Sequence, residues 1–390
     1  MTDIHRQSIV TYLKDSTGEM VRLLESLARA ESPSSVASSQ LPVKEILSDE
    51  FRRLGFHVRL LSGRSSGGSI MARPAVRERH RGLQLLLGHF DTVWPVGTID
   101  SMPFEVDGNI VRGPGVFDMK GGVVQILFAL RALADLGLTP QITPVVFLNS
   151  DEEIGSRESG NHIRLLARRV ERAFVMEPAL GTQGAIKTAR KGVGRFTVRV
   201  SGKAAHAGLD PESGASAILE LSHVIQELFG MNDPDKGITV NVGTIDGGIR
   251  PNVVAPESKA VIDVRVATHQ DAEMIEAKIR SIKPQIPGVT LDIDGAIGRP
   301  PLEPTEANRA LWETAKQLAS ELGIELTEGL AGGGSDGSTT SQYTATLDGL
   351  GPVGDGAHAP HEHLLIDKTI ERAALLTLLL LAPTLNGEPK

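Results

Sequence analysis

The sequence predicts an α/β domain, with a mostly parallel sheet and helices on both faces, into which a smaller α+β domain is inserted. Short apolar runs (LQLLLG, PVVFLNS, RAFVM) alternate with helical segments, as parallel strands joined by crossover helices do. From about residue 188 apolar and polar residues alternate instead, which is typical of strands with one wet face. The helical pattern returns near residue 300. We therefore expect a larger domain at 1–187 and 300–390, and an inserted domain at 188–299.

The elements of the first domain follow from their spacing and turn residues. Residues 4–30 carry apolar side chains at helical spacing, and a second helical stretch ends at Leu54-Gly55, where glycine suits a C-cap. HVRLL and SIMARP are strands separated by the turn-rich SGRSSGG, and LQLLLG is a buried strand. A helix (GGVVQILFALRALADLG), the strand PVVFLNS, a helix around residues 162–169 and the strand RAFVME follow.

The inserted domain is predicted as a βαββαβ-like unit. Its strands are GRFTVRVSG, ITVNVGTIDGG, SKAVIDVRV and VTLDIDG, and its helices are GASAILELSHVIQELFG and DAEMIEAKIRSI. After residue 300 we expect the helix ANRALWETAKQLASEL, a glycine-rich loop and a final helix that begins at Asp367.

Composition excludes several classes of protein. The 390 residues are 40% hydrophobic and 23% charged, and the net charge of −8 comes without a basic block, so nucleic-acid binding is not expected. No apolar run is long enough for a membrane span. The polar start MTDIHRQSIVTYLKDS lacks the apolar region of a secretory signal, so we expect a cytoplasmic protein. Because cysteine is absent, any metal must be held by oxygen and nitrogen ligands.

Acidic and imidazole side chains follow the ends of the apolar runs. LQLLLG is followed by His89 and Asp91, VVFLNSD by Glu152 and Glu153, and AFVM by Glu177. In open α/β sheets, ligands and catalytic groups gather beyond the carboxyl ends of the strands. Carboxylates and imidazoles that meet there are suitable ligands for a catalytic divalent cation.

His89 and Asp91 stand at positions i and i+2 of a strand end, so both point to one side. Either residue alone is as easily a cap or a satisfied polar group. As a pair, His89 fits a metal ligand, and Asp91 fits the carboxylate that binds the other imidazole nitrogen and fixes its tautomer.

The remaining acidic candidates also have structural alternatives. Asp118, in GPGVFDMKGG, can cap the helix that begins near Gly121 or bridge two ions, and Glu177 can cap a loop. The neighbours Glu152 and Glu153 can form a solvated acidic loop. At the end of a buried strand, however, they repel each other unless cations or a shared proton relieve them. One can then bind metal while the other acts as general base.

Two C-terminal segments are candidates for the same site. His358, in GDGAHAPHEH, is either a metal ligand or part of an exposed polar loop, and we interpret His361 and His363 as exposed polar residues. The sequence GGGSD at residues 332–336 lacks the spacing of a P-loop. It fits a flexible loop that approaches substrate through backbone groups, with Gly333 as the candidate.

Three residues of the expected inserted domain are candidates for substrate contact. His206 lies in the loop AAHAG, with an ordinary surface histidine as the alternative. Asn252, in RPNVV, and Arg265, in DVRV, are close in the chain. A guanidinium group binds a carboxylate with two parallel hydrogen bonds, so Arg265 suits a substrate carboxylate. Its alternative is a structural ion pair with an Asp or Glu.

Taken together, these segments resemble the zinc-dependent aminoacylase/carboxypeptidase family, which includes acetylornithine deacetylase and succinyl-diaminopimelate desuccinylase. Within it they are most similar to the bacterial glutamate carboxypeptidases. The resemblance covers nearly the whole chain. Its motifs are GHFDTVWPVG, GPGVFDMKGG, NSDEEIGS, the pair Glu177-Pro178, GKAAHAGLDPESGASAI, IRPNVVAPESKAVIDVRV, GGGSDGS and GAHAPHE.

The resemblance implies two zinc ions, with cobalt or manganese as other possible metals. One ion would be held by His89, Asp118 and Glu177. The other would be held by Asp118, Glu153 and His358, with Asp118 as the bridge.

The resemblance implies further roles outside the ligands. Glu152 would be the general base and then the proton donor to the leaving amine, and Asp91 would support His89. The inserted domain would mediate a homodimer. There His206 would help to stabilise the oxyanion, in many members from the partner subunit, while Asn252 and Arg265 would bind substrate.

The expected activity is hydrolysis of the amide bond in a peptide or N-acyl amino acid that carries a free carboxylate, as a glutamate-type carboxypeptidase does. Deacylation of N-acyl amino acids is the alternative within the family. A non-catalytic binding scaffold would be expected to lack a ligand or the base, and none is missing. A two-metal phosphohydrolase is the third alternative, but Arg265 and the absence of a basic block suit a carboxylate better than a phosphate ester.

Overall fold

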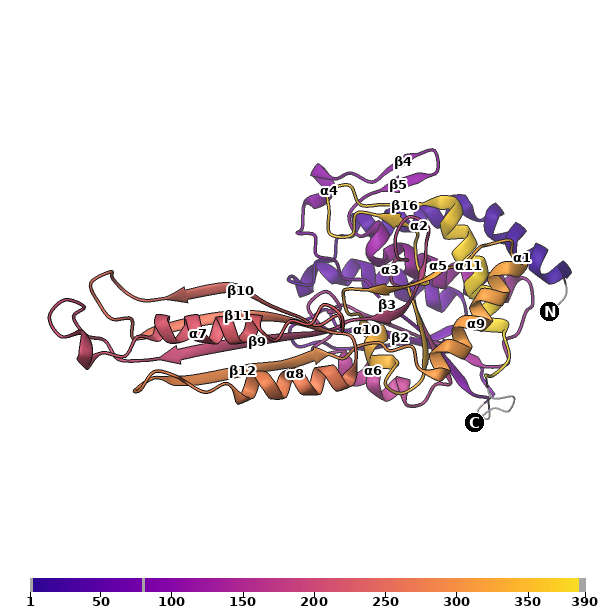
Figure 1. Ribbon diagram of the computed structural model, residues 1–390. Coiled ribbons are helices and arrows are strands. Elements are labelled where there is room, and N and C mark those ends of the chain that lie inside the picture. Colours follow the sequence, from indigo (N-terminus) through magenta and orange to yellow (C-terminus); the bar gives the residue numbers. More distant parts are fainter. Residues whose placement is uncertain (1–2, 79–80, 386–390) are drawn as a thin grey trace. The chain divides into compact units, whose positions relative to one another are not determined.

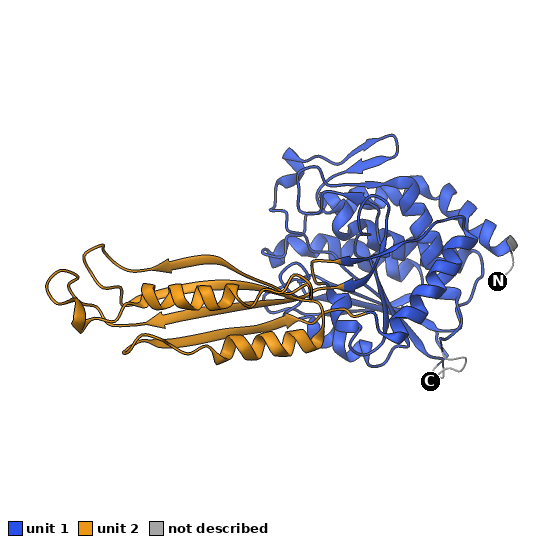
Figure 2. Cartoon of the chain, viewed as in Figure 1, with its two compact units in different colours: residues 1–189, 304–330, 335–390 blue, residues 190–303, 331–334 orange. Residues whose placement is uncertain are grey.

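The computed structural model describes residues 3–78 and 81–385. The chain divides into two compact units (Figure 2). Unit 1 comprises Met1–Ala189, Pro304–Leu330 and Ser335–Lys390, and unit 2 comprises Arg190–Glu303 and Ala331–Gly334. The glycine-rich segment 331–334, which the sequence analysis places in the larger domain, clusters with unit 2.

Unit 1 is built on an eight-stranded sheet with the strand order β1-β2-β6-β3-β7-β14-β8-β13. Its four central strands, β6, β3, β7 and β14, are mutually parallel, while the pairs β1/β2, β2/β6 and β14/β8 are antiparallel. The expected α/β fold with a mostly parallel sheet is therefore confirmed. The bounds are β1 (Phe56–Leu61), β2 (Ser69–Pro74), β3 (Leu83–His89), β6 (Thr143–Asn149), β7 (Arg172–Val175), β8 (Ile186–Arg190), β13 (Glu328–Ala331) and β14 (Ala345–Asp348).

Both faces of this sheet are covered by apolar side chains. Alternate residues of a strand point to opposite faces, and β3 separates Leu86 from Leu85 and Leu87 in this way. Leu86 joins the large core formed with the helices α1, α2, α3, α5, α9 and α11, whereas Leu85 and Leu87 join a smaller core with Ile163 of α6. The helices (Figure 1) are α1 (Asp3–Asp15), α2 (Thr17–Arg29), α3 (Leu41–Arg53), α5 (Gly121–Asp135), α6 (Gly160–Ala167), α9 (Glu306–Glu321) and α11 (Ile366–Leu381).

The N-terminal region differs from its prediction. The apolar spacing predicts one helix over residues 4–30, but the structure has α1 and α2, which meet at Ser16. Both the N–H and the hydroxyl of Ser16 donate to the Tyr12 carbonyl, at 3.0 and 2.8 Å. The Ser16 carbonyl then accepts from the N–H groups of Glu19 and Met20. A serine that bonds to the preceding turn in this way favours a bend, and the apolar spacing gives no sign of it.

Short strands in the C-terminal part are also absent from the prediction. There the sequence analysis names only helices and a loop, yet β14 is a buried, parallel member of the main sheet. A second, small antiparallel sheet has the order β15-β16-β5-β4. Each of these strands has at most four residues, which is too short for a period of two to be recognised. Their bounds are β4 (Glu105–Asp107), β5 (Ile110–Arg112), β15 (Gly354–Asp355) and β16 (His363–Leu365), and the short helices are α4 (Thr98–Ser101) and α10 (Asp336–Thr340).

The C-terminus of α11 is capped from inside unit 1. The last carbonyls of a helix have no partner within the helix and need one elsewhere. The guanidinium of Arg172, which is fully buried, donates to the carbonyls of Leu379 (3.1 Å) and Ala382 (2.7 Å). Gln84 donates to the Leu380 carbonyl at 3.0 Å and accepts from Arg172. A buried cation at this end also interacts favourably with the helix dipole.

Unit 2 has the element order β9-α7-β10-β11-α8-β12. Its sheet is antiparallel, with the strand order β10-β11-β9-β12. Buried and less buried residues alternate along β9, as the sequence pattern predicts, and both helices pack into one core on the same face of the sheet. The bounds are β9 (Gly192–Ser201), α7 (Ala217–Phe229), β10 (Thr239–Gly247), β11 (Glu257–Val266), α8 (His269–Ser281) and β12 (Thr290–Arg299).

Across the described ranges of the chain, the structure contains no helix with both the length and the apolar character needed to cross a bilayer.

Candidate metal centre

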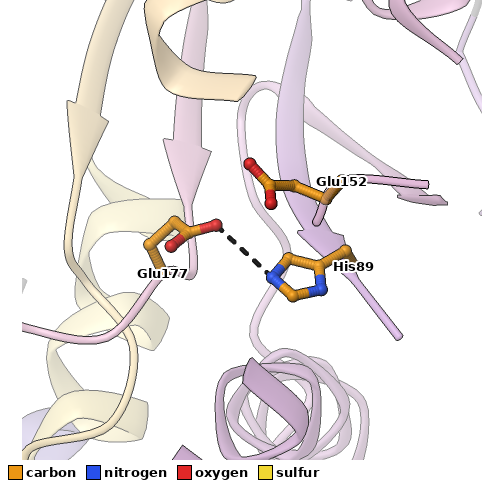
Figure 3. A group of neighbouring side chains, drawn as sticks. All are labelled: His89, Glu152 and Glu177. Atoms are coloured by element: carbon orange, nitrogen blue, oxygen red, sulfur yellow. Dashed lines mark ion pairs between the residues drawn. The ribbon is translucent and has the colours of Figure 1, made fainter. Parts of the chain in front are cut away.

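Neighbouring parallel strands bring the acidic and imidazole candidates of unit 1 to one edge of the sheet. His89 ends β3 and pairs in register with Asn149, the last residue of β6. Glu152 follows β6 by three residues, and Glu177 follows β7, the other neighbour of β3. Figure 3 shows the side chains of His89, Glu152 and Glu177 directed toward a common space.

A single carboxylate lies between the two imidazole groups. Asp118 Oδ1 is 3.4 Å from His89 Nε2, and its Oδ2 is 3.5 Å from His358 Nε2. Each imidazole also meets a second carboxylate. His89 Nε2 is 3.5 Å from Glu177 Oε1, and His358 Nε2 is 3.1 Å from Glu153 Oε2. The structure thus brings together all five residues that the sequence analysis names as candidate metal ligands.

The nitrogen and oxygen atoms of this cluster are suited to bind a metal ion. His89 Nε2 and Asp118 Oδ1 are buried and lack a hydrogen-bond partner among the described residues, which is costly for polar atoms unless something else binds them. The potential ligand atoms of His89, Glu152 and Glu177 lie within 4.8 Å of one another, as do those of His89, Asp118 and Glu153. Such nitrogen and oxygen ligands suit zinc and related divalent ions. The residues present therefore fit a metal.

Asp91 holds both His89 and the loop that carries the two adjacent glutamates. Its carboxylate Oδ1 is 3.4 Å from His89 Nδ1, and its backbone carbonyl is 3.0 Å from the same nitrogen. The carboxylate also accepts the N–H groups of Glu152 and Glu153, at 3.3 and 3.2 Å, and the Ser34 hydroxyl at 2.6 Å. The support of His89 was foreseen from the sequence, whereas the support of the 152–153 backbone was not.

Without a metal ion, the opposed charges of the cluster shift its pKa values. Burial lowers the pKa of His89, but the nearby carboxylates of Asp118, Asp91 and Glu177 outweigh this and hold it well above the ordinary value. Hydrogen bonds with Asp118 and then Glu153 raise the pKa of His358 to about 10.

The pKa values of two carboxylates of the cluster shift in opposite directions. Burial would raise the pKa of Asp118, yet the neighbouring imidazoles of His358 and His89 hold it well below its usual range. Burial raises the pKa of Glu153 to about 7. The imidazoles thus carry protons that a metal ion would have to displace.

A cavity of about 370 Å³ adjoins the metal cluster. Asp118 forms part of its wall, together with Phe117, Pro178, Lys187 and His361. The volume lies within the range of small-molecule sites. His361, which we interpreted from the sequence as an ordinary polar residue, therefore lines a potential binding cavity, and Lys187 was not singled out at all.

The other predicted site residues belong to unit 2. His206 is exposed, and its Nδ1 accepts the N–H groups of Gly208 and Leu209, both at 3.2 Å. The exposed Asn252 lies beside it, because the Asn252 carbonyl accepts the N–H of Ala207 at 3.0 Å. The loops of His206 and Asn252 are thus neighbours within unit 2.

Arg265 and Gly333 lie in a second region of unit 2. The guanidinium of Arg265 forms a two-point ion pair with Asp263, at 2.8 and 3.0 Å, which is the structural alternative raised from the sequence. Its Nη1 also donates to the Gly332 carbonyl at 3.4 Å. The neighbouring Gly333 carbonyl accepts from Arg190 Nη1 at 3.0 Å. The glycine-rich loop is therefore fixed to unit 2 by two arginines.

The sequence is similar to those of known proteins. The family profile described as peptidase family M20/M25/M40 matches residues 85–382. Carboxypeptidase G2 of Pseudomonas sp. strain RS-16 is 28% identical over 351 residues, which are 88% of this chain and 84% of that protein. Succinyl-diaminopimelate desuccinylase of Azoarcus sp. strain BH72 is 27% identical over 354 residues, 86% of this chain and 91% of that protein.

The fold is similar to that of solved peptidase structures. Aminopeptidase PepT from Bacillus cereus superposes with a TM-score of 0.77 at 19% identity, over 93% of this chain and 98% of that chain. This likeness concerns the fold alone. The family profile spans most of the chain and includes every candidate metal ligand. The chain therefore belongs to peptidase family M20/M25/M40, a family of metallopeptidases.

Proposed function

We propose that the protein is a dizinc hydrolase that cleaves the amide bond of a peptide or N-acyl amino acid with a free carboxylate, as a glutamate-type carboxypeptidase does. The observation that supports this best is the position of Asp118 between the imidazoles of His89 and His358. A carboxylate with one oxygen toward each imidazole is arranged as a bridging ligand would be. The relative named carboxypeptidase G2 and the relative named a desuccinylase are both consistent with this class of reaction.

In this proposal His89, Asp118 and Glu177 hold one zinc ion, and Asp118, Glu153 and His358 hold the other. Cobalt or manganese are alternative metals, because the same ligands bind several ions. When bound, the ions supply Lewis-acid chemistry, which polarises the scissile carbonyl and makes water easier to deprotonate.

The proton transfers are assigned to Glu152. Its carboxylate takes a proton from the attacking water and later gives it to the leaving nitrogen, as a general acid–base group does. Asp91 accepts the N–H of Glu152 and so fixes the backbone that carries the base. The same carboxylate orients His89.

The substrate contacts are assigned residue by residue. The cavity beside Asp118 is large enough to receive part of a small substrate. We assign stabilisation of the oxyanion to the exposed His206, and binding of the substrate to Asn252, Arg265 and the backbone at Gly333. The Arg265 fork would bind the substrate carboxylate and exchange part of its pairing with Asp263.

A homodimer through unit 2 is part of the proposal. β10 is an edge strand of the unit 2 sheet, and Ile245 on it is 67% exposed. An edge strand has a row of backbone N–H and C=O groups on which another strand can pair. Light scattering of the wild type and of Ile245→Lys tests this. A monomeric wild type would contradict the dimer.

We also propose a cytoplasmic location, which cell fractionation tests.

The general base is tested with Glu152→Gln. This variant should keep its metal content and lose most of its turnover, because the amide cannot accept the proton. Glu158→Gln is the matched control, since the Glu158 carboxylate is engaged by Ser65 and Ser66 in the same region of the chain. Near-wild-type turnover in Glu152→Gln would contradict the assignment.

The substrate class is tested by a screen of metal-loaded protein. Peptides with C-terminal glutamate, other dipeptides, N-acyl amino acids and a generic phosphoester form the panel. Preference for N-acyl amino acids over peptides would favour the deacylase alternative, which the desuccinylase relative supports. Cleavage of the phosphoester alone, or of no compound, would contradict the proposal and favour a phosphohydrolase or a binding scaffold.

A further inference from the structure

Glu362 is a fully buried glutamate whose carboxylate receives four hydrogen bonds. Its Oε2 accepts from Trp94 Nε1 at 2.6 Å and from the N–H of Gly115 at 3.0 Å. Its Oε1 accepts from the N–H groups of Phe117 and Asp118, at 2.9 and 3.0 Å. A buried carboxylate is costly unless donors satisfy it, and here donors approach both oxygens.

These bonds join two distant loops of unit 1. Glu362 follows His358 by four residues, whereas its backbone donors precede it by roughly 245 residues. The His358 loop is itself folded against Glu362, because the Glu362 N–H donates to the Ala359 carbonyl at 2.9 Å. Gly356 completes this turn with a φ of 82°, and a Cβ at this position would lie 2.8 Å from backbone atoms of Glu362.

The contact reaches the residue between the two imidazoles. Glu362 binds the backbone N–H of Asp118, and the Asp118 side chain approaches both His89 and His358. Glu362 itself approaches neither imidazole in any contact described above. Its effect on the cluster must therefore pass through the backbone of Asp118 on one side and of His358 on the other.

We propose that Glu362 is a positioning residue of the metal centre, which fixes Asp118 relative to His358 and so sets the affinity for the ion that these two residues share. This inference rests on the proposed dizinc centre. Outer-shell partners of metal ligands typically change metal affinity by about 10- to 100-fold when they are replaced. We expect an effect of that size on the ion held by Asp118, Glu153 and His358, and a smaller effect on the other ion, because it shares only Asp118 with this pair.

The variant Glu362→Gln removes one of the two acceptor oxygens of Glu362 and keeps the size of the side chain. In Glu362→Gln one oxygen becomes an NH₂ group, which cannot accept either of the two bonds at that position. The remaining oxygen keeps its pair of donors, so the shape is conserved while half of the hydrogen bonds are lost. Trp94→Phe removes the indole donor alone and leaves the three backbone bonds.

The test measures metal binding rather than turnover. Metal-free wild type, Glu362→Gln and Trp94→Phe are titrated with Zn²⁺ against a competing chelator, and Co²⁺ titrations followed by visible absorption report each site. We call the ion held by His89, Asp118 and Glu177 the first ion, and the ion held by Asp118, Glu153 and His358 the second. In Glu362→Gln the affinity for the second ion should fall by about 10- to 100-fold, and the affinity for the first should stay within about threefold of wild type. Trp94→Phe should show a smaller loss at the same ion.

Glu50→Gln separates this role from general stability. Glu50 is also buried, pairs with Arg131 and Arg53, and lies in α3, away from the ligand-bearing loops. The Glu50→Gln variant should have a lower thermal unfolding midpoint than wild type and an unchanged affinity for both metal ions. Wild-type affinity for both ions in folded Glu362→Gln, or an equal loss at both ions that Glu50→Gln reproduces, would overturn the inference.

Two further outcomes are decisive. If Glu362→Gln does not fold, Trp94→Phe decides, and unchanged binding of the second ion in Trp94→Phe overturns the inference. If the wild type itself binds no metal, the proposed dizinc function fails and this inference falls with it. A wild type that binds two ions, with Glu362→Gln unchanged, overturns the positioning role alone.

Discussion

The carboxylate of Asp91 accepts the backbone N–H of Glu152, which lies 61 residues further along the chain, at 3.3 Å. The same Oδ1 is 3.4 Å from His89 Nδ1. One side chain thus orients an imidazole at the end of β3 and the loop that follows β6. In the proposed enzyme, these two groups are a metal ligand and the general base.

Asp91→Asn should therefore impair both groups at once. The amide can accept at only one of its two positions, so the His89 ring and the 152–153 backbone lose part of their support. We expect kcat/KM to fall by about 10- to 100-fold. Ser34→Ala is the control, because it removes a donor to Asp91 and leaves the carboxylate in place. Activity of Asp91→Asn within about twofold of wild type would speak against this role.

Metal binding should release protons at neutral pH. Hydrogen bonds with Asp118 and Glu153 raise the pKa of His358 to about 10, so this imidazole is protonated at pH 7 in the metal-free protein. An imidazole must be neutral to bind a metal. Binding therefore displaces its proton, and affinity should rise as pH increases toward 10, since fewer protons remain to be displaced.

Calorimetry of Zn²⁺ binding in buffers of different ionisation enthalpy measures this release. His358→Ala should release fewer protons than wild type. Heats that are the same in all buffers would show that no proton leaves, contrary to the prediction.

Arg172→Met should destabilise unit 1. The substitution keeps an apolar side chain of similar length but leaves the carbonyls of Leu379 and Ala382 without their buried donor. We expect a loss of about 3 kcal/mol in the free energy of unfolding, measured by chemical denaturation. The exposed Arg169→Met serves as the control and should change stability little. Equal stability of the two variants would contradict the capping role.

Glu220→Ala should destabilise unit 2 selectively. Glu220 is fully buried, and its carboxylate accepts the N–H of Gln285 at 3.0 Å and of Ile286 at 2.8 Å. Its removal leaves two amides unsatisfied, which costs about 2 to 4 kcal/mol. Glu227, exposed on the same helix, provides the control variant Glu227→Ala. Hydrogen exchange should report faster opening in unit 2 for Glu220→Ala alone, and unchanged protection there would disprove the claim.

The long elements of the fold could be predicted from the sequence, because their buried positions give a regular pattern of apolar residues. β3 and β6 are continuous apolar runs since both faces of their sheet are covered, and β9 alternates because only one face is. β14 could not be found in this way. Its four residues, ATLD, include a buried aspartate that accepts a hydrogen bond from the Ser335 hydroxyl, so the segment does not look apolar.

The candidate site could be predicted as far as its residues stand directly after strands or in recognisable motifs. His89 ends β3, Glu152 and Glu177 follow β6 and β7, and the sheet itself brings them together. Glu362 could not be assigned a role, although it stands beside the histidines of HAPHEH. Its partners are three backbone amides and an indole from distant residues, and such partners leave no trace in a residue pattern.

The order of the proposed ligands along the chain has a consequence for biosynthesis. His89, Asp118, Glu153 and Glu177 are all translated before unit 2, whereas His358 is translated after it. A nascent chain at the ribosome therefore contains four of the five proposed ligands when the last residue of unit 2 is added. His358 and Glu362 are added only after unit 2. A ribosome that stops between unit 2 and residue 358 releases a product that contains the proposed carboxylate ligands and His89 but lacks His358 and Glu362.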